Sequence, residues 1–115
     1  MTKIKICGIK TIEASRTAAM NGADFIGMVF VDNVKRKISI DTAQGIVTDI
    51  RKTNEKTKIV GLFRNQNSKY ITEVINRLGL DLIQLCGSEN PQDFIDIPIE
   101  VFKQIRIKHS DNTTS

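Results

Sequence analysis

Apolar stretches typical of strands alternate along this chain with stretches that have the apolar spacing of helices. Residues 24–31 are almost continuously apolar, as expected of a strand that is covered on both faces. Farther along, Ala43, Ile46, Val47 and Ile50 recur at the spacing that places them on one face of a helix. Strict alternation of strands and helices predicts a parallel sheet with right-handed crossovers. This alternation limits the fold class more than any other feature of the sequence.

The same patterns predict the individual elements. Strands are expected over residues 3–9, 24–31, 57–63, 81–85 and 101–107. Helices are expected over residues 12–21, from Ser39 or Asp41 to about Lys52, from Asn67 or Ser68 to residue 78, and over a short stretch after Pro91. Thr11 is a suitable N-cap, and Gly22 and Gly79 suit helix C-termini. Residues 1–108 therefore form one unit, and residues 109–115 an expected disordered tail.

Length and composition exclude several classes of protein. A chain of 115 residues allows one domain with a modest core, and 40% hydrophobic residues with charges of both signs exclude intrinsic disorder. No apolar run approaches the roughly 18 residues of a membrane span, and the start lacks a signal peptide. We therefore expect a soluble, cytoplasmic protein that does not bind membranes.

The charges and cysteines restrict the ligands further. The net charge of +4 is spread along the chain, which favours an anionic small molecule over nucleic acid. Cys7 and Cys86 lie far apart and neither belongs to a CxxC pair, so neither zinc nor dithiol redox chemistry is expected. No glycine-rich phosphate loop is present. His109, next to the tail, is not expected to act in catalysis.

Two architectures fit the alternation. One is a complete, doubly wound five-stranded sheet of flavodoxin type. The other is the first part of an eight-stranded β/α barrel, which normally needs about 200 residues or more. Periodicity alone does not choose between them, but both bind ligands at the carboxyl ends of their strands.

The first strand end carries Cys7 and Gly8. A buried free cysteine often serves only as a small apolar group. At a strand end, beside cations and before a glycine that lets a ligand approach the backbone, a thiol can instead act as nucleophile or base. Cys7 is therefore the first candidate for chemistry.

Later strand ends supply candidates for binding. Lys35, Arg36 and Lys37 form a basic triplet that could hold an anion, and arginine grips a carboxylate best because its planar fork matches the two oxygens. Arg64, after the third strand, could add to the positive charge of this triplet. Gln84 is expected at the ligand end or in the core. Cys86 has no adjacent base and is expected to be inert. The residues alone thus predict an anionic small-molecule site on an α/β sheet.

Five motifs, in order and at matching spacings, resemble the N-terminal half of phosphoribosylanthranilate isomerase over about residues 3–108. They are KICGIK at residues 5–10, GADFIGMVF at 22–30, KRKIS at 35–39, VGLF at 60–63 and LIQLCG at 82–87. The resemblance implies a partial TIM (β/α)8 barrel, in which five parallel strands with intervening helices form an open half-barrel.

The resemblance also implies an activity in tryptophan biosynthesis. Members of this family convert N-(5-phosphoribosyl)anthranilate to 1-(2-carboxyphenylamino)-1-deoxyribulose 5-phosphate by an Amadori rearrangement, without metal or organic cofactor. Cys7 matches the family's general base, and Arg36 matches the arginine that holds the anthranilate carboxylate. Gly8 and Gln84 are expected to contact the same phosphosugar–anthranilate substrate.

The sequence departs from the family in two ways. Cys86 stands where the family usually has a histidine. The chain also stops after the fifth strand, whereas the family's general acid lies on the sixth and its phosphate site around the seventh and eighth. Asp111 lies in the tail and is not assigned the acid's role. The chain alone is therefore expected to be inactive, and a complementing C-terminal half or a second copy is an expected partner.

The alternative is a non-enzymatic, flavodoxin-like binding or signalling module. A phosphate-accepting receiver of that size needs acidic residues at the ends of its first and third strands to hold a divalent cation. Those positions are occupied by Cys7 and Arg64.

Overall fold

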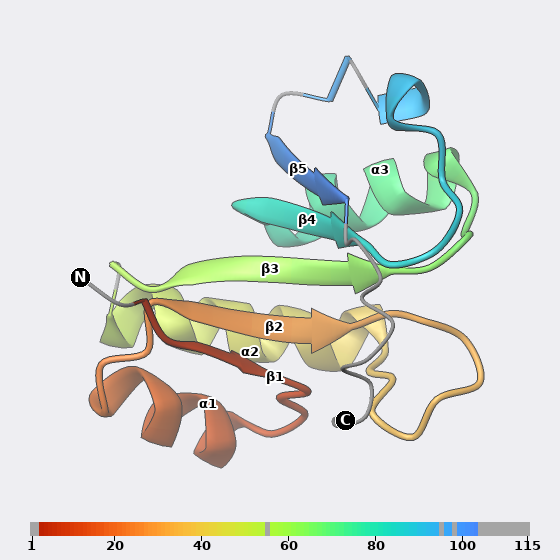
Figure 1. Cartoon of the computed structure of the whole chain (residues 1–115). Helices are drawn as coiled ribbons and strands as arrows, with labels where there is room; N and C mark the ends of the chain where they lie inside the picture. Colours follow the sequence, from red (N-terminus) through yellow and green to blue (C-terminus); the bar gives the residue numbers. More distant parts are fainter. Residues whose placement is uncertain (1–2, 55, 95, 98, 104–115) are drawn as a thin grey trace, which may run out of the picture.

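The computed structural model describes residues 3–54, 56–94, 96–97 and 99–103, in which strands and helices alternate (Figure 1). The elements in chain order are β1 (Lys5–Cys7), α1 (Ile12–Met20), β2 (Phe25–Val29), α2 (Ile40–Thr53), β3 (Lys58–Phe63), α3 (Ser68–Leu78), β4 (Leu82–Leu85), the 3₁₀ helix η1 (Pro91–Phe94) and β5 (Glu100–Lys103). The short helix expected after Pro91 is thus a single 3₁₀ turn. Residues 104–107 of the expected last strand, and the expected tail, lie outside the described residues.

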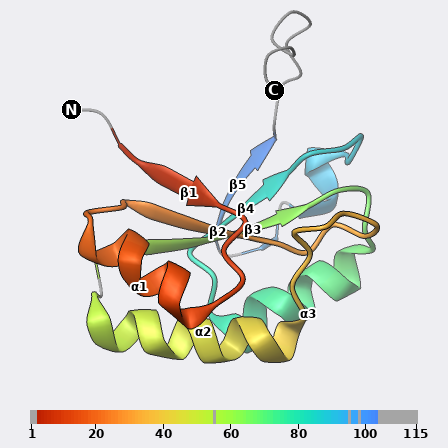
Figure 2. The same cartoon turned by 90° about the horizontal axis from the view of Figure 1, so that it is seen from below.

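The order of the strands decides between the two architectures. All neighbouring strands are parallel, and their order in the sheet is β1-β2-β3-β4-β5. A flavodoxin-like sheet instead places its first strand between the second and third, so that alternative is wrong. Because each right-handed crossover steps to the next strand in the same direction, the helices stay on one face. Figure 2 shows α1, α2 and α3 together on that face.

The sheet is therefore wound as in a β/α barrel but is open, and it corresponds to a partial TIM barrel. Its convex face packs against the helices through buried apolar residues such as Ile26, Met28, Ile59 and Ile83. Side chains alternate between the two faces of a strand. Cys7, Gly27 and Gln84 consequently belong to the opposite, concave face.

The helix starts follow the expected capping residues. The side chains of Thr11, Ser39 and Asn67 accept hydrogen bonds from backbone amides of the first turns of α1, α2 and α3. Ser39, and not Asp41, is thus the N-cap of α2. Gly79 ends α3 with φ at 65°, a left-handed conformation that favours glycine.

The amino end of the sheet is held by carboxylates. Asp24 accepts a hydrogen bond from the Ile4 amide at 2.8 Å, and Asp81 accepts one from the Ile59 amide at 2.8 Å. Asp81 also lies 3.1 Å from Arg51, a residue of α2. These contacts tie neighbouring β/α units together at the end of the sheet opposite to the strand carboxyl ends.

Replacing Asp81 is expected to destabilise the fold. Asp81→Ala removes the acceptor for the part-buried Ile59 amide, and loss of a hydrogen bond to a charged group costs about 1.5–3 kcal/mol. The free energy of unfolding from urea denaturation measures the effect. Asp41→Asn is the control, because Asp41 is 90% exposed and its ion pair with Arg77 lies on the surface. Equal losses in the two variants would contradict a structural role for Asp81.

Within the described residues, no helix is both long enough and apolar enough to cross a membrane.

Candidate functional site

At the carboxyl ends of the strands, the side chain of Arg36 lies against the backbone of Gly8. Gly8 has φ at 81°, which turns the chain away from β1 directly after Cys7. A Cβ atom placed on Gly8 would lie only 2.7 Å from Cδ and 3.3 Å from Nε of Arg36. Glycine is therefore favoured at this position by its conformation, and a side chain there would displace the arginine. The structure places Cys7, Gly8 and Arg36 at the same rim of the sheet.

The thiol of Cys7 lies over the neighbouring strand. A Cβ atom placed on Gly27 of β2 would be 3.0 Å from the Cys7 Sγ, so the absence of a side chain at Gly27 makes room for the thiol. Cys7 is half-buried and is not part of a disulfide. Its sulfur thus lies on the concave face, below a rim that carries a guanidinium.

The loop that carries Arg36 is tied down at several points. The Ile38 amide donates to the Val29 carbonyl at 2.9 Å and closes the loop. Lys37 forms an ion pair with Asp32 inside it. The Nζ of Lys10 donates to the Lys35 carbonyl at 3.1 Å, which joins this loop to the one that follows β1. The sequence indicated no such role for Lys10, because the hydrogen bond links residues from two different loops.

Among the described residues, one cation at this rim has a carboxylate partner and three do not. Lys37 is neutralised by Asp32, and this partner raises the pKa of the Lys37 ammonium through their hydrogen bond. Lys10, Lys35 and Arg36 are exposed and have no carboxylate partner in the part of the chain that the structure describes. Like charges that gather without counter-charge favour binding of an anion.

Gln84 lies on the concave face, as Cys7 does, and is half-buried. The Nζ of Lys5 donates to its Oε1, although β2 and β3 separate β1 from β4. The sheet is therefore curved enough for side chains of its first and fourth strands to meet. Lys5 was not among the predicted site residues, although its position two residues before Cys7 places both on one face.

Arg64 lies one loop away from the cluster around Arg36. It lines a cavity of about 410 Å³ between the loops after β2 and β3, together with residues that include Asp32, Lys37 and Tyr70. Gln66 joins these two loops, because its Nε2 donates to the Phe30 carbonyl at 2.5 Å. Arg64 and Lys37 thus line the same cavity.

Cys86 has surroundings that keep its thiol protonated. Burial raises the pKa of Cys86, and the carboxylate of Glu89 raises it further, against smaller opposing effects of Lys5 and Arg64. This direction supports the expectation of an inert thiol. Among the described residues, no cluster of His, Cys, Asp and Glu could hold a metal ion.

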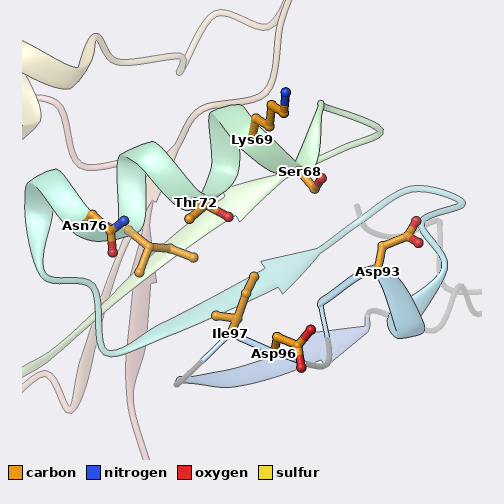
Figure 3. A pocket seen from close by; sticks show the side chains of 8 residues that line it. Ser68, Lys69, Thr72, Asn76, Asp93, Asp96 and Ile97 are labelled. Carbon is orange, nitrogen blue, oxygen red and sulfur yellow. The ribbon is translucent and has the colours of Figure 1, made fainter.

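A second cavity, of about 390 Å³, lies on the helical side of the molecule between α3 and η1 (Figure 3). Ser68, Lys69, Thr72 and Asn76 of α3 line one side of it, and Asp93 lies on the other. In the described part of the connection from β4 to β5, the helical segment is the 3₁₀ turn η1. It contains neither Cys7 nor Arg36.

Comparison with known proteins assigns the fold to a family. Residues 4–115 match the family model described as N-(5'-phosphoribosyl)anthranilate (PRA) isomerase. The chain belongs to the phosphoribosylanthranilate isomerase family. One curated relative, the N-(5'-phosphoribosyl)anthranilate isomerase of Streptococcus mutans, is 36% identical over 100% of this chain and 58% of its own length.

Solved structures of phosphoribosylanthranilate isomerases agree with this assignment. The Thermotoga maritima protein is 32% identical, with a TM-score of 0.82 over 90% of this chain and 50% of its own. A family member in complex with reduced 1-(o-carboxyphenylamino)-1-deoxyribulose 5-phosphate is 30% identical, with a TM-score of 0.86 over 97% of this chain and 57% of its own. The chain thus spans about half the length of the relatives that it matches.

Proposed function

We propose that this chain supplies the base and the carboxylate-binding half of a phosphoribosylanthranilate isomerase site, for a reaction that needs no metal or organic cofactor. The observation that carries the proposal is the close approach of the Arg36 side chain to Gly8, the residue that follows the half-buried Cys7. Family membership supports the same assignment, because both residues stand in motifs that resemble the family's.

The chemistry requires a base and a fixed cation close together. After the furanose ring opens, the substrate is a Schiff base between C1 of the sugar and the anthranilate nitrogen. In the proposed step the Cys7 thiolate removes the proton from C2 of the N-protonated Schiff base. The electron pair of that C–H bond forms the C1–C2 double bond, and the π pair of the C1–N double bond moves to nitrogen, which gives a neutral enolamine. The enolamine then becomes the ketone when C1 gains a proton and the hydroxyl of C2 loses one. A base positioned in this way raises the reaction rate by a factor of about 10²–10⁴.

Arg36 is proposed to hold the anthranilate carboxylate and so to position C2 above the sulfur. A planar guanidinium can grip both carboxylate oxygens, and a fixed geometry lowers the entropic cost of proton transfer. Lys10 and Lys35 add positive charge at the same rim, and Gly8 and Gln84 are proposed to contact the substrate from below. The acid that opens the ring and the phosphate site belong, in this proposal, to the part of the family fold that this chain does not cover.

Binding of anthranilate tests the role of Arg36. Arg36→Met is expected to weaken anthranilate binding to the 115-residue chain about tenfold, the low end of the effect of a hydrogen bond between charged groups. Titrations followed by NMR measure the affinity, with aniline as the ligand that lacks the carboxylate. Lys56→Met is the matched control, because it removes one exposed positive charge just before β3, at the opposite end of the strands. The proposal fails if Arg36→Met and Lys56→Met bind anthranilate equally well.

A further inference from the structure

The loop after β2 presents Arg36 from a tight turn. The Lys37 amide donates to the Val34 carbonyl at 3.2 Å, which is the hydrogen bond that closes a four-residue β-turn. Lys35 and Arg36 are the two central residues of this turn. The peptide group between them consists of the Lys35 carbonyl and the Arg36 amide, and it takes no part in the turn's own hydrogen bond. The direction in which Arg36 leaves the loop depends on the orientation of this peptide group.

The central peptide group of a β-turn has two opposite orientations, which distinguish turns of types I and II. Type II needs a positive φ at the second central residue and therefore favours glycine there. Arg36 occupies that position. The residues other than glycine with positive φ in the described chain are Asn33 and Asn65, so the turn at Arg36 is not of type II. A contact that holds the Lys35 carbonyl would hold this orientation.

Lys10 supplies such a contact from outside the loop. Its Nζ donates to the Lys35 carbonyl at 3.1 Å. The backbone that carries Lys10 is fixed on both sides, because the Ile9 amide donates to the Gly27 carbonyl at 3.3 Å and Thr11 caps α1. The hydrogen bond therefore joins the turn to a segment that is itself held to β2 and to the first helix.

The side chain of Arg36 contacts the same segment. Its Cδ and Nε lie against Gly8, two residues before Lys10. The loop after β1 thus contacts Arg36 at two places, at the peptide group that sets its backbone direction and along its side chain. A long side chain that is held before a ligand arrives loses less conformational entropy when the ligand binds.

We infer that Lys10 is a positioning residue for Arg36, because it fixes the turn at residues 34–37 and so holds the guanidinium against the loop after β1. The inference rests on the proposed function, in which Arg36 holds a carboxylate, and it names a residue on which that binding depends. Lys10 acts through the backbone of the turn and not by contact with the ligand. Loss of its hydrogen bond therefore lowers the affinity while the guanidinium itself stays intact.

Anthranilate binding to the 115-residue chain, followed by NMR titration, tests this role. Lys10→Met is expected to weaken binding about fivefold, the effect of one ordinary hydrogen bond. Lys35→Met is the matched control, because it removes an equal, exposed charge from the same turn and keeps the carbonyl that Lys10 binds. It is expected to weaken binding at most about twofold at physiological ionic strength, because salt screens exposed charges. Equal weakening by the two variants would overturn the inference.

A double-mutant cycle separates positioning from direct contact with the ligand. If Lys10 acts through Arg36, Lys10→Met has no further effect on binding once Arg36→Met is in place. The same loss of affinity with and without Arg36 would show that the Lys10 charge acts on the ligand directly, which would also overturn the inference.

The free chain gives a readout that needs no ligand. The Arg36 amide belongs to the same peptide group as the Lys35 carbonyl, so its ¹⁵N relaxation reports the motion of that group. Greater mobility of this amide is expected in Lys10→Met and not in Lys35→Met. Unchanged mobility in Lys10→Met would contradict the positioning role. Both variants replace exposed side chains, and circular dichroism shows whether each one folds.

Failure of this inference and failure of the proposed function give different results. If Arg36→Met leaves anthranilate binding unchanged, the proposed carboxylate site is wrong, and the mobility of the Arg36 amide still decides whether Lys10 holds the turn. If Arg36→Met weakens binding and Lys10→Met does not, the carboxylate site stands and the role of Lys10 is wrong.

Discussion

The isolated 115-residue chain is expected to convert N-(5-phosphoribosyl)anthranilate at no more than about one hundredth of the rate of a full-length relative. The reaction needs a proton delivered to the furanose oxygen. Without a positioned acid, the rate is expected to fall by a factor of about 10²–10⁴. Loss of the phosphate site removes further binding energy that would position the sugar. Fluorescence of the anthranilate group follows the reaction, with the Streptococcus mutans enzyme as the reference.

Addition of the unmatched part of that enzyme is expected to restore measurable turnover. The two pieces would then present base, acid and phosphate site around one concave surface. Turnover by the isolated chain at a rate close to the reference would contradict the proposed division of the site.

In the restored complex, Cys7→Ala is expected to lower kcat by a factor of about 10²–10⁴ and to leave KM nearly unchanged. The reason is that the sulfur is proposed to act on the C2 proton, while Arg36 and the phosphate site supply the binding. Rates at saturating and at low substrate concentration separate the two constants. A fall in kcat/KM that comes from KM alone would contradict the role of Cys7 as a base.

Cys86→Ala is the matched control for Cys7→Ala. Both cysteines are half-buried and free, and both lie at carboxyl ends of strands in the same sheet. The raised pKa of Cys86 keeps its thiol protonated near neutral pH. Its replacement is therefore expected to change kcat far less. Equal effects of the two replacements would show that the loss comes from packing and not from proton transfer.

Much of the local structure followed from the sequence. Thr11 and Gly79 were expected at helix ends and lie there, because capping depends on residues within a single turn. Residues 24–31 contain β2, since an apolar run of that length is covered on both faces. The strand end at Cys7 and Gly8 could be located for the same local reason.

Contacts between distant segments could not be predicted in this way. Lys10 reaches the loop of Arg36, Lys5 reaches Gln84, and Arg64 and Lys37 line one cavity. Each of these depends on how far the sheet curves and on how the loops fold over its rim. Neither property leaves a periodic pattern in the sequence.

By itself the sequence determined the alternation of strands and helices, because apolar periodicity and capping act within each element. Only the tertiary structure decided that the strands follow one another in consecutive order, with all three helices on one face. The reason is that the same alternation of strands and helices fits two strand orders. In a barrel each new strand is added on the same side of the sheet, whereas in a doubly wound sheet the direction reverses once, and only the pairing between strands distinguishes the two. The consecutive winding curves the sheet, places Arg36 against Gly8, the residue that follows Cys7, and leaves the second edge of β1 without a partner strand among the described residues.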